Sequence, residues 1–184
     1  MARYHLYENP PSFIPNRTGS ALMNRQVGNT IPDFVRFALP HNYNIARAAG
    51  APKPQALNVA RWMTQQQGLE SEYGRSNAAK NNNRSGSMSG GKTIKFDNVD
   101  SNNRNILNMF VNRFPNAFKQ LTLEDYVNYL QNGTYRYEDS LPAGEYLNRI
   151  RGTKSLNKAI DEYYNSGITN NWTSLDGLNL YNRI

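Results

Sequence analysis

The predicted fold is organised around one short run, Gly68-Leu69-Glu70-Ser71-Glu72-Tyr73-Gly74-Arg75-Ser76. Residues 55–67 before it carry apolar side chains at helical spacing, which predicts an amphipathic helix that ends at this run. Glu70 is therefore expected at a helix C-terminus, where backbone carbonyls already concentrate partial negative charge. A carboxylate there is disfavoured by about 0.3–1 kcal/mol. The same field favours the protonated form, which makes Glu70 a candidate general acid.

The bulk properties narrow the class of protein. With 184 residues, the chain predicts one domain with an appended arm. The net charge of +7 predicts attraction to polyanions such as cell-wall phosphate polymers, nucleic acid or anionic membranes. There is no cysteine, and the two histidines are His5 and His41, which argues against a zinc amidase and against any thiolate site. We expect no metal and no cofactor.

No targeting or membrane segment is expected. The first residues lack the apolar stretch of a signal peptide, and no segment approaches the roughly 20 apolar residues of a membrane span. A protein of this kind that acts on a cell wall would be carried there by another component, for example as part of a virion.

Residues 1–54 differ in composition from the rest and predict an irregular, extended arm. They hold seven of the chain's 9 prolines, which fix φ and bias their predecessors away from helix. A short helix over residues 31–39 is compatible with Pro32 near its start. The arm could pack on its own domain or dock on a neighbouring virion or tail subunit.

Residues 55–167 predict a mainly helical domain with a small β element. After the first helix, residues 77–91 are rich in Gly, Ser and Asn and predict a loop, which could cover a groove or simply be exposed. Residues 92–99 predict a short strand or half a hairpin. Helices follow over 102–114, from the Thr122 cap to Gly133, over 143–151 and over 155–165. Residues 168–184 are expected to fold back as a tail onto the domain or a neighbour.

The central run resembles a known signature. Glu-Ser-x-(Tyr or Trp)-Gly-x-Ser at a helix end is similar to the motif of the glucosaminidase domain of bacterial and phage cell-wall hydrolases, matched here by Glu70, Ser71, Tyr73, Gly74 and Ser76. A looser match, 133–139 with 146–150, is similar to that family's Gly-Tyr-Ala-Thr-Asp-Pro-x-Tyr stretch. The resemblance covers roughly residues 54–167. It implies a lysozyme-like fold, cleavage of peptidoglycan glycan strands, and Glu70 as general acid.

The resemblance and the loop composition together suggest site residues. Tyr73 and Ser76 belong to the signature, Tyr135 and Tyr137 could stack on sugar faces, and Asn82 could donate to sugar hydroxyls or acetamido carbonyls. Glycoside hydrolysis normally needs a second carboxylate. The family pattern would place it on a hairpin after the signature, but no acidic residue lies between Glu72 and Asp97. Asp97, with Asp100 beside it, is the nearest candidate base.

Several functions therefore stay open. A glycan hydrolase with Glu70 and Asp97 is the first hypothesis, and a lytic transglycosylase that uses Glu70 alone is the nearest competing enzyme. A non-catalytic virion or tail protein with a degenerate lysozyme-like domain would use the arm to bind its neighbours. A nucleic-acid partner is disfavoured, because the basic residues are scattered and no known binding motif is present.

Overall fold

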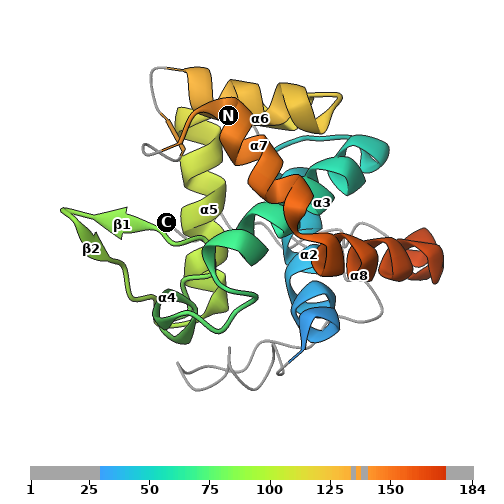
Figure 1. The fold of residues 1–184 in the computed structure, drawn as a ribbon, viewed down its shortest axis with the longest axis horizontal. Helices are drawn as coiled ribbons and strands as arrows, with labels where there is room; N and C mark the ends of the chain where they lie inside the picture. The colour runs from blue at the N-terminus through green and yellow to red at the C-terminus, as the bar shows by residue number, and fades with distance from the viewer. Residues whose placement is uncertain (1–29, 134–135, 138–140, 173–184) are drawn as a thin grey trace.

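The computed structural model describes residues 30–133, 136–137 and 141–172, and these form a mainly helical domain (Figure 1). The described residues contain seven α-helices, two 3₁₀ helices and one two-stranded sheet. The mainly helical class with a small β element is confirmed, whereas the lysozyme-like topology stays a prediction. None of the helices in the described part of the chain is long and apolar enough to cross a membrane.

Helices α2 (Ile31–Ala48) and α3 (Lys53–Glu70) form the centre of the domain. Thr30 caps α2 through a capping box with Asp33, which satisfies two of the free amides at the helix start. The apolar face of α2 is buried against α3, α5 (Val99–Arg113) and α8 (Lys154–Asn165). This packing places the C-terminal end of α3 next to the loops that follow it.

The expected extent of the arm differs from the structure in the residues that are described. Positions 31–48, predicted as part of an irregular arm with at most a short helix, form the 18-residue helix α2. Pro32 and Pro54 occupy the first turns of α2 and α3, where a missing amide costs nothing, and Pro52 is the N-cap of α3. Pro40 does lie inside α2, where a proline costs about 3 kcal/mol, and burial of its neighbours offsets that cost. Residues 1–29 of the predicted arm lie outside the described residues.

A short helix and a hairpin follow α3. Helix α4 spans Asn77–Lys80, and strands β1 (Met88–Ser89) and β2 (Lys92–Thr93) pair antiparallel with Met88 opposite Thr93. Gly90 and Gly91 form the two-residue turn, both with positive φ, as such a turn requires. The hairpin projects from the body of the domain beside α5 (Figure 1).

The remaining elements enclose the other side of α3. They are η1 (Ala117–Lys119), α6 (Leu123–Asn132), α7 (Ala143–Gly152), α8 and η2 (Ile168–Asn171). The bounds of α6, α7 and α8 agree closely with the helices predicted from periodicity. The start of the predicted tail packs on the domain, since Trp172 is buried with its ring 4.7 Å from that of Tyr43. Residues 173–184 of that tail lie outside the described residues.

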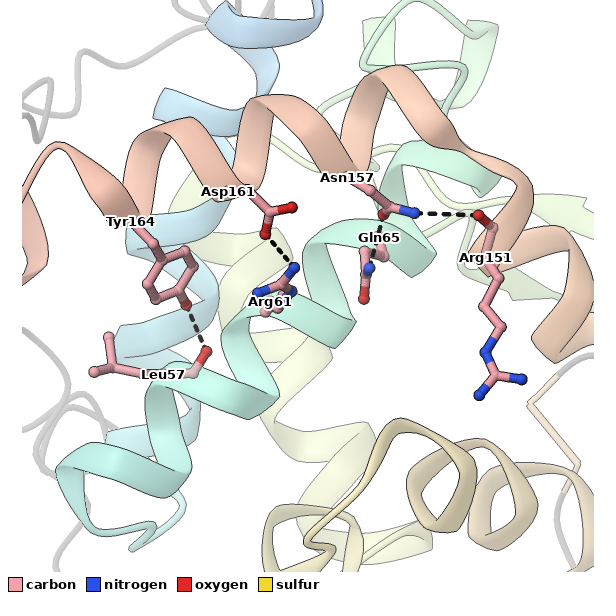
Figure 2. Close-up of polar contacts among 7 residues, drawn as sticks. All are labelled: Leu57, Arg61, Gln65, Arg151, Asn157, Asp161 and Tyr164. Carbon is pink, nitrogen blue, oxygen red and sulfur yellow. Dashed lines mark hydrogen bonds and ion pairs between the residues drawn. The ribbon is translucent and has the colours of Figure 1, made fainter.

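Helix α8 lies along α3 and is joined to it by polar contacts over its whole length (Figure 2). The Tyr164 hydroxyl donates to the Leu57 carbonyl at 2.5 Å, and Gln65 Nε2 donates to Asn157 Oδ1 at 2.7 Å. Arg61 and Asp161 form an ion pair between these two contacts. These contacts fix the axis of α3, and with it the position of its last residue, Glu70.

Candidate functional site

A groove of about 790 Å³ lies at the C-terminal end of α3. Its lining comes from the end of α3, the segment before and within the hairpin, α5 and the residues after α6. The lining residues are Glu70, Ser85, Gly86, Ser87, Met88, Ser89, Ile94, Asn105, Asn108, Met109, Asn112, Arg113, Phe114, Arg136 and Tyr137. Most of these side chains are amides, hydroxyls or apolar groups.

Glu70 is the last residue of α3, as the sequence predicts, and it lines the groove while partly buried. The chain turns sharply after it. The Ser71 hydroxyl donates to the Gln67 carbonyl at 2.6 Å and accepts the Gly74 amide at 2.9 Å. Glu72 and Tyr73 have φ values of 51° and 58°, so the helix ends in consecutive left-handed residues. The Ser and Gly of the signature thus build the turn that ends the helix at Glu70.

A buried phenol holds one oxygen of the Glu70 carboxyl group. The hydroxyl of Tyr146, a fully buried residue of α7, donates to Glu70 Oε1 at 3.1 Å. Gly86, with φ +65°, lies near the other carboxyl oxygen, Oε2. A Cβ added to Gly86 would be 3.9 Å from that oxygen. Oε1 is therefore anchored in the protein, and Oε2 faces the segment that lines the groove.

Tyr146 belongs to a buried hydrogen-bonded set beneath Glu70. The Tyr126 hydroxyl donates to Gln66 Oε1 at 3.0 Å, and Gln66 also interacts with the Tyr146 hydroxyl. Burial, with the nearby Tyr137 and Glu70 adding to it, raises the pKa of Tyr146 well above its ordinary value. The phenol therefore keeps its proton at neutral pH and acts as a hydrogen-bond donor to Glu70. It also joins the two segments that carry the family resemblance, which are 76 residues apart.

A buried arginine supports the wall of the groove. Arg84 is fully buried, and its guanidinium donates to three amide oxygens: Gln67 Oε1 at 3.0 Å, Asn102 Oδ1 at 3.1 Å and Asn42 Oδ1 at 3.2 Å. Burial lowers the pKa of Arg84 to about 9, so the group stays charged at neutral pH. This contact ties the segment that enters the groove at Ser85 to α2, α3 and α5.

The same burial bears on residues 77–91, predicted as a loop that could cover a groove or be exposed. Apart from α4 and β1 this segment is irregular, it lines the groove from Ser85 to Ser89, and Asn82, Asn83 and Arg84 are fully buried, each at 0% exposure. Their side chains satisfy backbone carbonyls; Asn83 Nδ2, for example, donates to the carbonyls of Ser87 and Ile94 at 2.7 and 2.9 Å. Composition did not separate the two alternatives, because asparagine and serine are usually solvated. Here the same side chains replace the hydrogen bonds that regular secondary structure would supply.

Asparagines on α5 line the groove, and the sequence analysis did not identify them. Asn105, Asn108 and Asn112 recur at i, i+3 and i+7 and so share one helix face. Asn105 Nδ2 donates to the Ser87 hydroxyl at 3.0 Å, which joins α5 to the opposite wall. The signal was present, since a polar stripe runs beside the apolar face of this helix. A solvent-facing stripe has the same pattern, so only the fold shows that this one faces a groove.

Of the other predicted site residues, Tyr137 lines the groove, half-buried against Phe110 and Phe114. Asp97 is exposed and does not line the groove. Tyr135 lies outside the described residues.

Three further predicted residues have structural contacts away from the groove lining. Tyr73 packs edge-on against Phe34, with ring centroids 6.5 Å apart. Ser76 is the N-cap of α4, where its side chain accepts the Ala79 amide at 3.2 Å. Asn82 Nδ2 donates to the Phe96 carbonyl at 2.9 Å.

The groove can thus present one carboxyl group to a bound molecule. Glu70 is the single acidic side chain among the described residues that line it. The described residues also contain no group of three or more His, Asp or Glu side chains placed to hold a metal ion. What the site offers is a proton donor or acceptor at Glu70, amide and hydroxyl partners for polar groups, and an aromatic ring at Tyr137. Comparison of the chain with family models, curated proteins and solved structures finds no match to any of them.

Proposed function

We propose that this protein cleaves glycan strands of bacterial peptidoglycan, with Glu70 as the general acid. The observation that carries the proposal is the placement of Glu70: a helix-terminal carboxyl group, anchored by Tyr146, in a groove lined with amides and hydroxyls. Sugars with acetamido and hydroxyl groups need such partners. The proposal depends on the groove, because a Glu70 side chain that lined no groove could not reach a glycan strand.

In the proposed reaction Glu70 donates its proton to the glycosidic oxygen as the bond to that oxygen breaks. The leaving sugar departs as an alcohol. Glu70, now a carboxylate, then takes a proton from the group that attacks the remaining sugar. That group is water in a hydrolase. It is a hydroxyl of the same sugar in a transglycosylase, which forms an internal ring.

The single carboxyl group among the lining residues that the structure describes favours mechanisms that need no second one. An inverting hydrolase needs two carboxyl groups about 6.5–9.5 Å apart, and a retaining one about 5–5.5 Å apart. No described lining residue offers a partner to Glu70 at either separation, because no other is acidic. This observation favours the transglycosylase as the second candidate, together with a hydrolase in which the substrate's own acetamido group assists.

A zymogram with peptidoglycan tests the function. We expect the wild-type chain to clear the substrate and Glu70→Gln to lose clearing while keeping its helical circular dichroism. Glu72→Gln is the matched control, since Glu72 is exposed and does not line the groove. Mass spectrometry of the products separates the two enzymes, because a hydrolysis product contains one added water and an internal-ring product does not. A soluble, folded wild-type chain that clears nothing would support a non-catalytic role.

A further inference from the structure

The charged residues that line the groove include more cations than anions. Arg113 and Arg136 line it together with Glu70, and the other described lining residues are uncharged. Both arginines are exposed, so they can be reached by a bound molecule. Among the described lining residues the charge is therefore net positive when Glu70 is ionised, and more so when Glu70 carries the proton that an acid needs.

The wall of the groove increases this positive charge. Residues 73–96 contain the cations Arg75, Lys80, Arg84, Lys92 and Lys95 and no acidic residue. This segment supplies the hairpin and the lining residues from Ser85 to Ser89. Arg84 is buried beneath it with amide oxygens as its hydrogen-bond acceptors, and the charge of Asp100 acts on it and offsets its charge only in part. A charge in that position is screened by water less than one at the surface.

Neutral hydrogen-bonding groups lie beside these cations. Asn105 and Asn112 are seven residues apart on α5, which corresponds to about 10.5 Å along the helix, and Arg113 follows directly. An amide side chain offers both a donor and an acceptor, as acetamido and hydroxyl groups require. A guanidinium offers a planar fork of donors that matches a carboxylate. A ligand that satisfies both sets carries acetamido groups and carboxylates on one strand.

We propose that Arg113 and Arg136 make the groove selective for glycan strands that carry carboxylate groups over neutral strands of the same length. The proposal rests on the proposed function insofar as the ligand is a glycan. Single-stranded nucleic acid is the competing polyanion. Its recognition relies on a track of cations with stacked aromatic rings. This groove instead has an acid at the end of α3 and a row of amides along α5.

Binding to the full chain with Glu70→Gln, which prevents cleavage, tests the selectivity. The ligands are oligosaccharides of alternating N-acetylglucosamine and N-acetylmuramic acid, the same oligosaccharides with the carboxylates reduced to alcohols, and chitin oligosaccharides of equal length. We expect the carboxylated strand to bind most tightly. Adding Arg113→Gln or Arg136→Gln should weaken that binding by about fivefold for each arginine. Neither change should alter the affinity for the reduced strand.

Arg149→Gln in the same background is the matched control. Arg149 is an exposed arginine of α7, paired with Glu145 at 3.1 Å, and it does not line the groove. Its loss should leave all three affinities unchanged. Equal binding of carboxylated and reduced strands would overturn the proposal, as would arginine variants that weaken both strands alike, or displacement of the glycan by single-stranded DNA of equal charge.

The test separates this inference from the proposed function. Cleavage is measured with the wild-type chain on the same carboxylated and reduced strands. Selective binding without cleavage would contradict the enzyme activity and support the recognition of carboxylates. Cleavage and binding of both strands at equal levels would support the enzyme and overturn the selectivity.

Discussion

The hydroxyl of Tyr146 holds Glu70 from a position that water does not reach. It is 3.1 Å from Oε1, so its removal should loosen the hold on that oxygen and shift the carboxyl group relative to the reacting oxygen. We expect Tyr146→Phe to lower turnover of glycan strands by about 10- to 100-fold, since small misplacements of a catalytic group have effects of that size. Its free energy of unfolding should fall by only about 0.5–1.5 kcal/mol, the usual contribution of one hydrogen bond.

Tyr164→Phe is the control for that prediction. Its hydroxyl lies in the α3–α8 contact, where it donates to the Leu57 carbonyl (Figure 2). Leu57 is near the start of α3, whereas Glu70 is its last residue. A similar loss of stability with normal turnover is expected. Equal turnover in the two variants would show that Tyr146 does not position Glu70.

Arg84 contributes to the stability of the domain as a buried charge whose hydrogen-bond partners are neutral. Replacing it by Met would leave the oxygens of Gln67, Asn102 and Asn42 without this donor. A buried acceptor left without its hydrogen-bond partner typically costs about 1–3 kcal/mol. We expect a loss of that size in urea unfolding. Arg84→Lys should also be destabilised, because an ammonium cannot match the planar fork that reaches three acceptors. A lysine variant as stable as the wild type would contradict this account.

Gly68 controls how closely α8 approaches α3. A Cβ at this position would lie 2.5 Å from Leu156 Cδ2 and 3.3 Å from Phe34 Cε1, both in the core. Overpacking costs about 1–3 kcal/mol, more than the roughly 0.5–1 kcal/mol that alanine gains over glycine in a helix. We therefore expect Gly68→Ala to be destabilised in chemical unfolding.

Two comparisons make this prediction specific. In a Leu156→Ala background the same change should become neutral or stabilising, because the clashing methyl is gone. Gly144→Ala in α7 meets no atom within 4 Å and should be neutral or stabilising on its own. Destabilisation at both glycines would point to a backbone effect and not to the α3–α8 contact.

The helices show which features of this fold a single sequence can predict. Periodicity found α3, α5, α6, α7 and α8, because each buries one continuous apolar face. It missed the second half of α2, residues 40–48, because three of the prolines nearby mark helix starts while Pro40 lies in the interior of α2. The number of prolines in a segment does not distinguish a proline at a helix start from one in a helix interior. The end of α3 at Glu70 was predictable from the signature residues, which form the local turn.

The candidate site was less predictable than the helices, because it depends on contacts distant in sequence. Glu70 was identified from local sequence, but its anchor Tyr146 comes from α7 and the asparagine row from α5. Tyr73 and Asn82 were predicted to bind substrate, yet one packs on Phe34 and the other on a backbone carbonyl. Polar and aromatic residues near a motif serve packing as readily as binding. Only the three-dimensional arrangement separates the two roles.

Buried ionisable groups set the pH range over which the whole domain is stable. Burial, reinforced by the charge of Arg84, lowers the pKa of His41 well below its ordinary value. The unfolded chain therefore takes up a proton near pH 6.5 that the folded chain refuses, and stability falls as the pH drops below about 6.5. Burial raises the pKa of Tyr126, Tyr146 and Tyr164 above the ordinary value. Above about pH 10 the unfolded chain loses phenolic protons that the folded chain retains, so stability falls there too.

Urea unfolding between pH 8 and 11 measures the alkaline side of this range. Each tyrosine that titrates only in the unfolded chain should lower the free energy of unfolding by about 1.4 kcal/mol per pH unit above pH 10. Arg84 acts in the opposite sense, because its pKa of about 9 lets the folded chain release a costly charge at high pH. Three tyrosines outweigh one arginine, so a net fall is expected. Tyr126→Phe should make the fall shallower, because it removes one of the buried phenols. An unchanged slope in this variant would contradict the assignment to buried phenols.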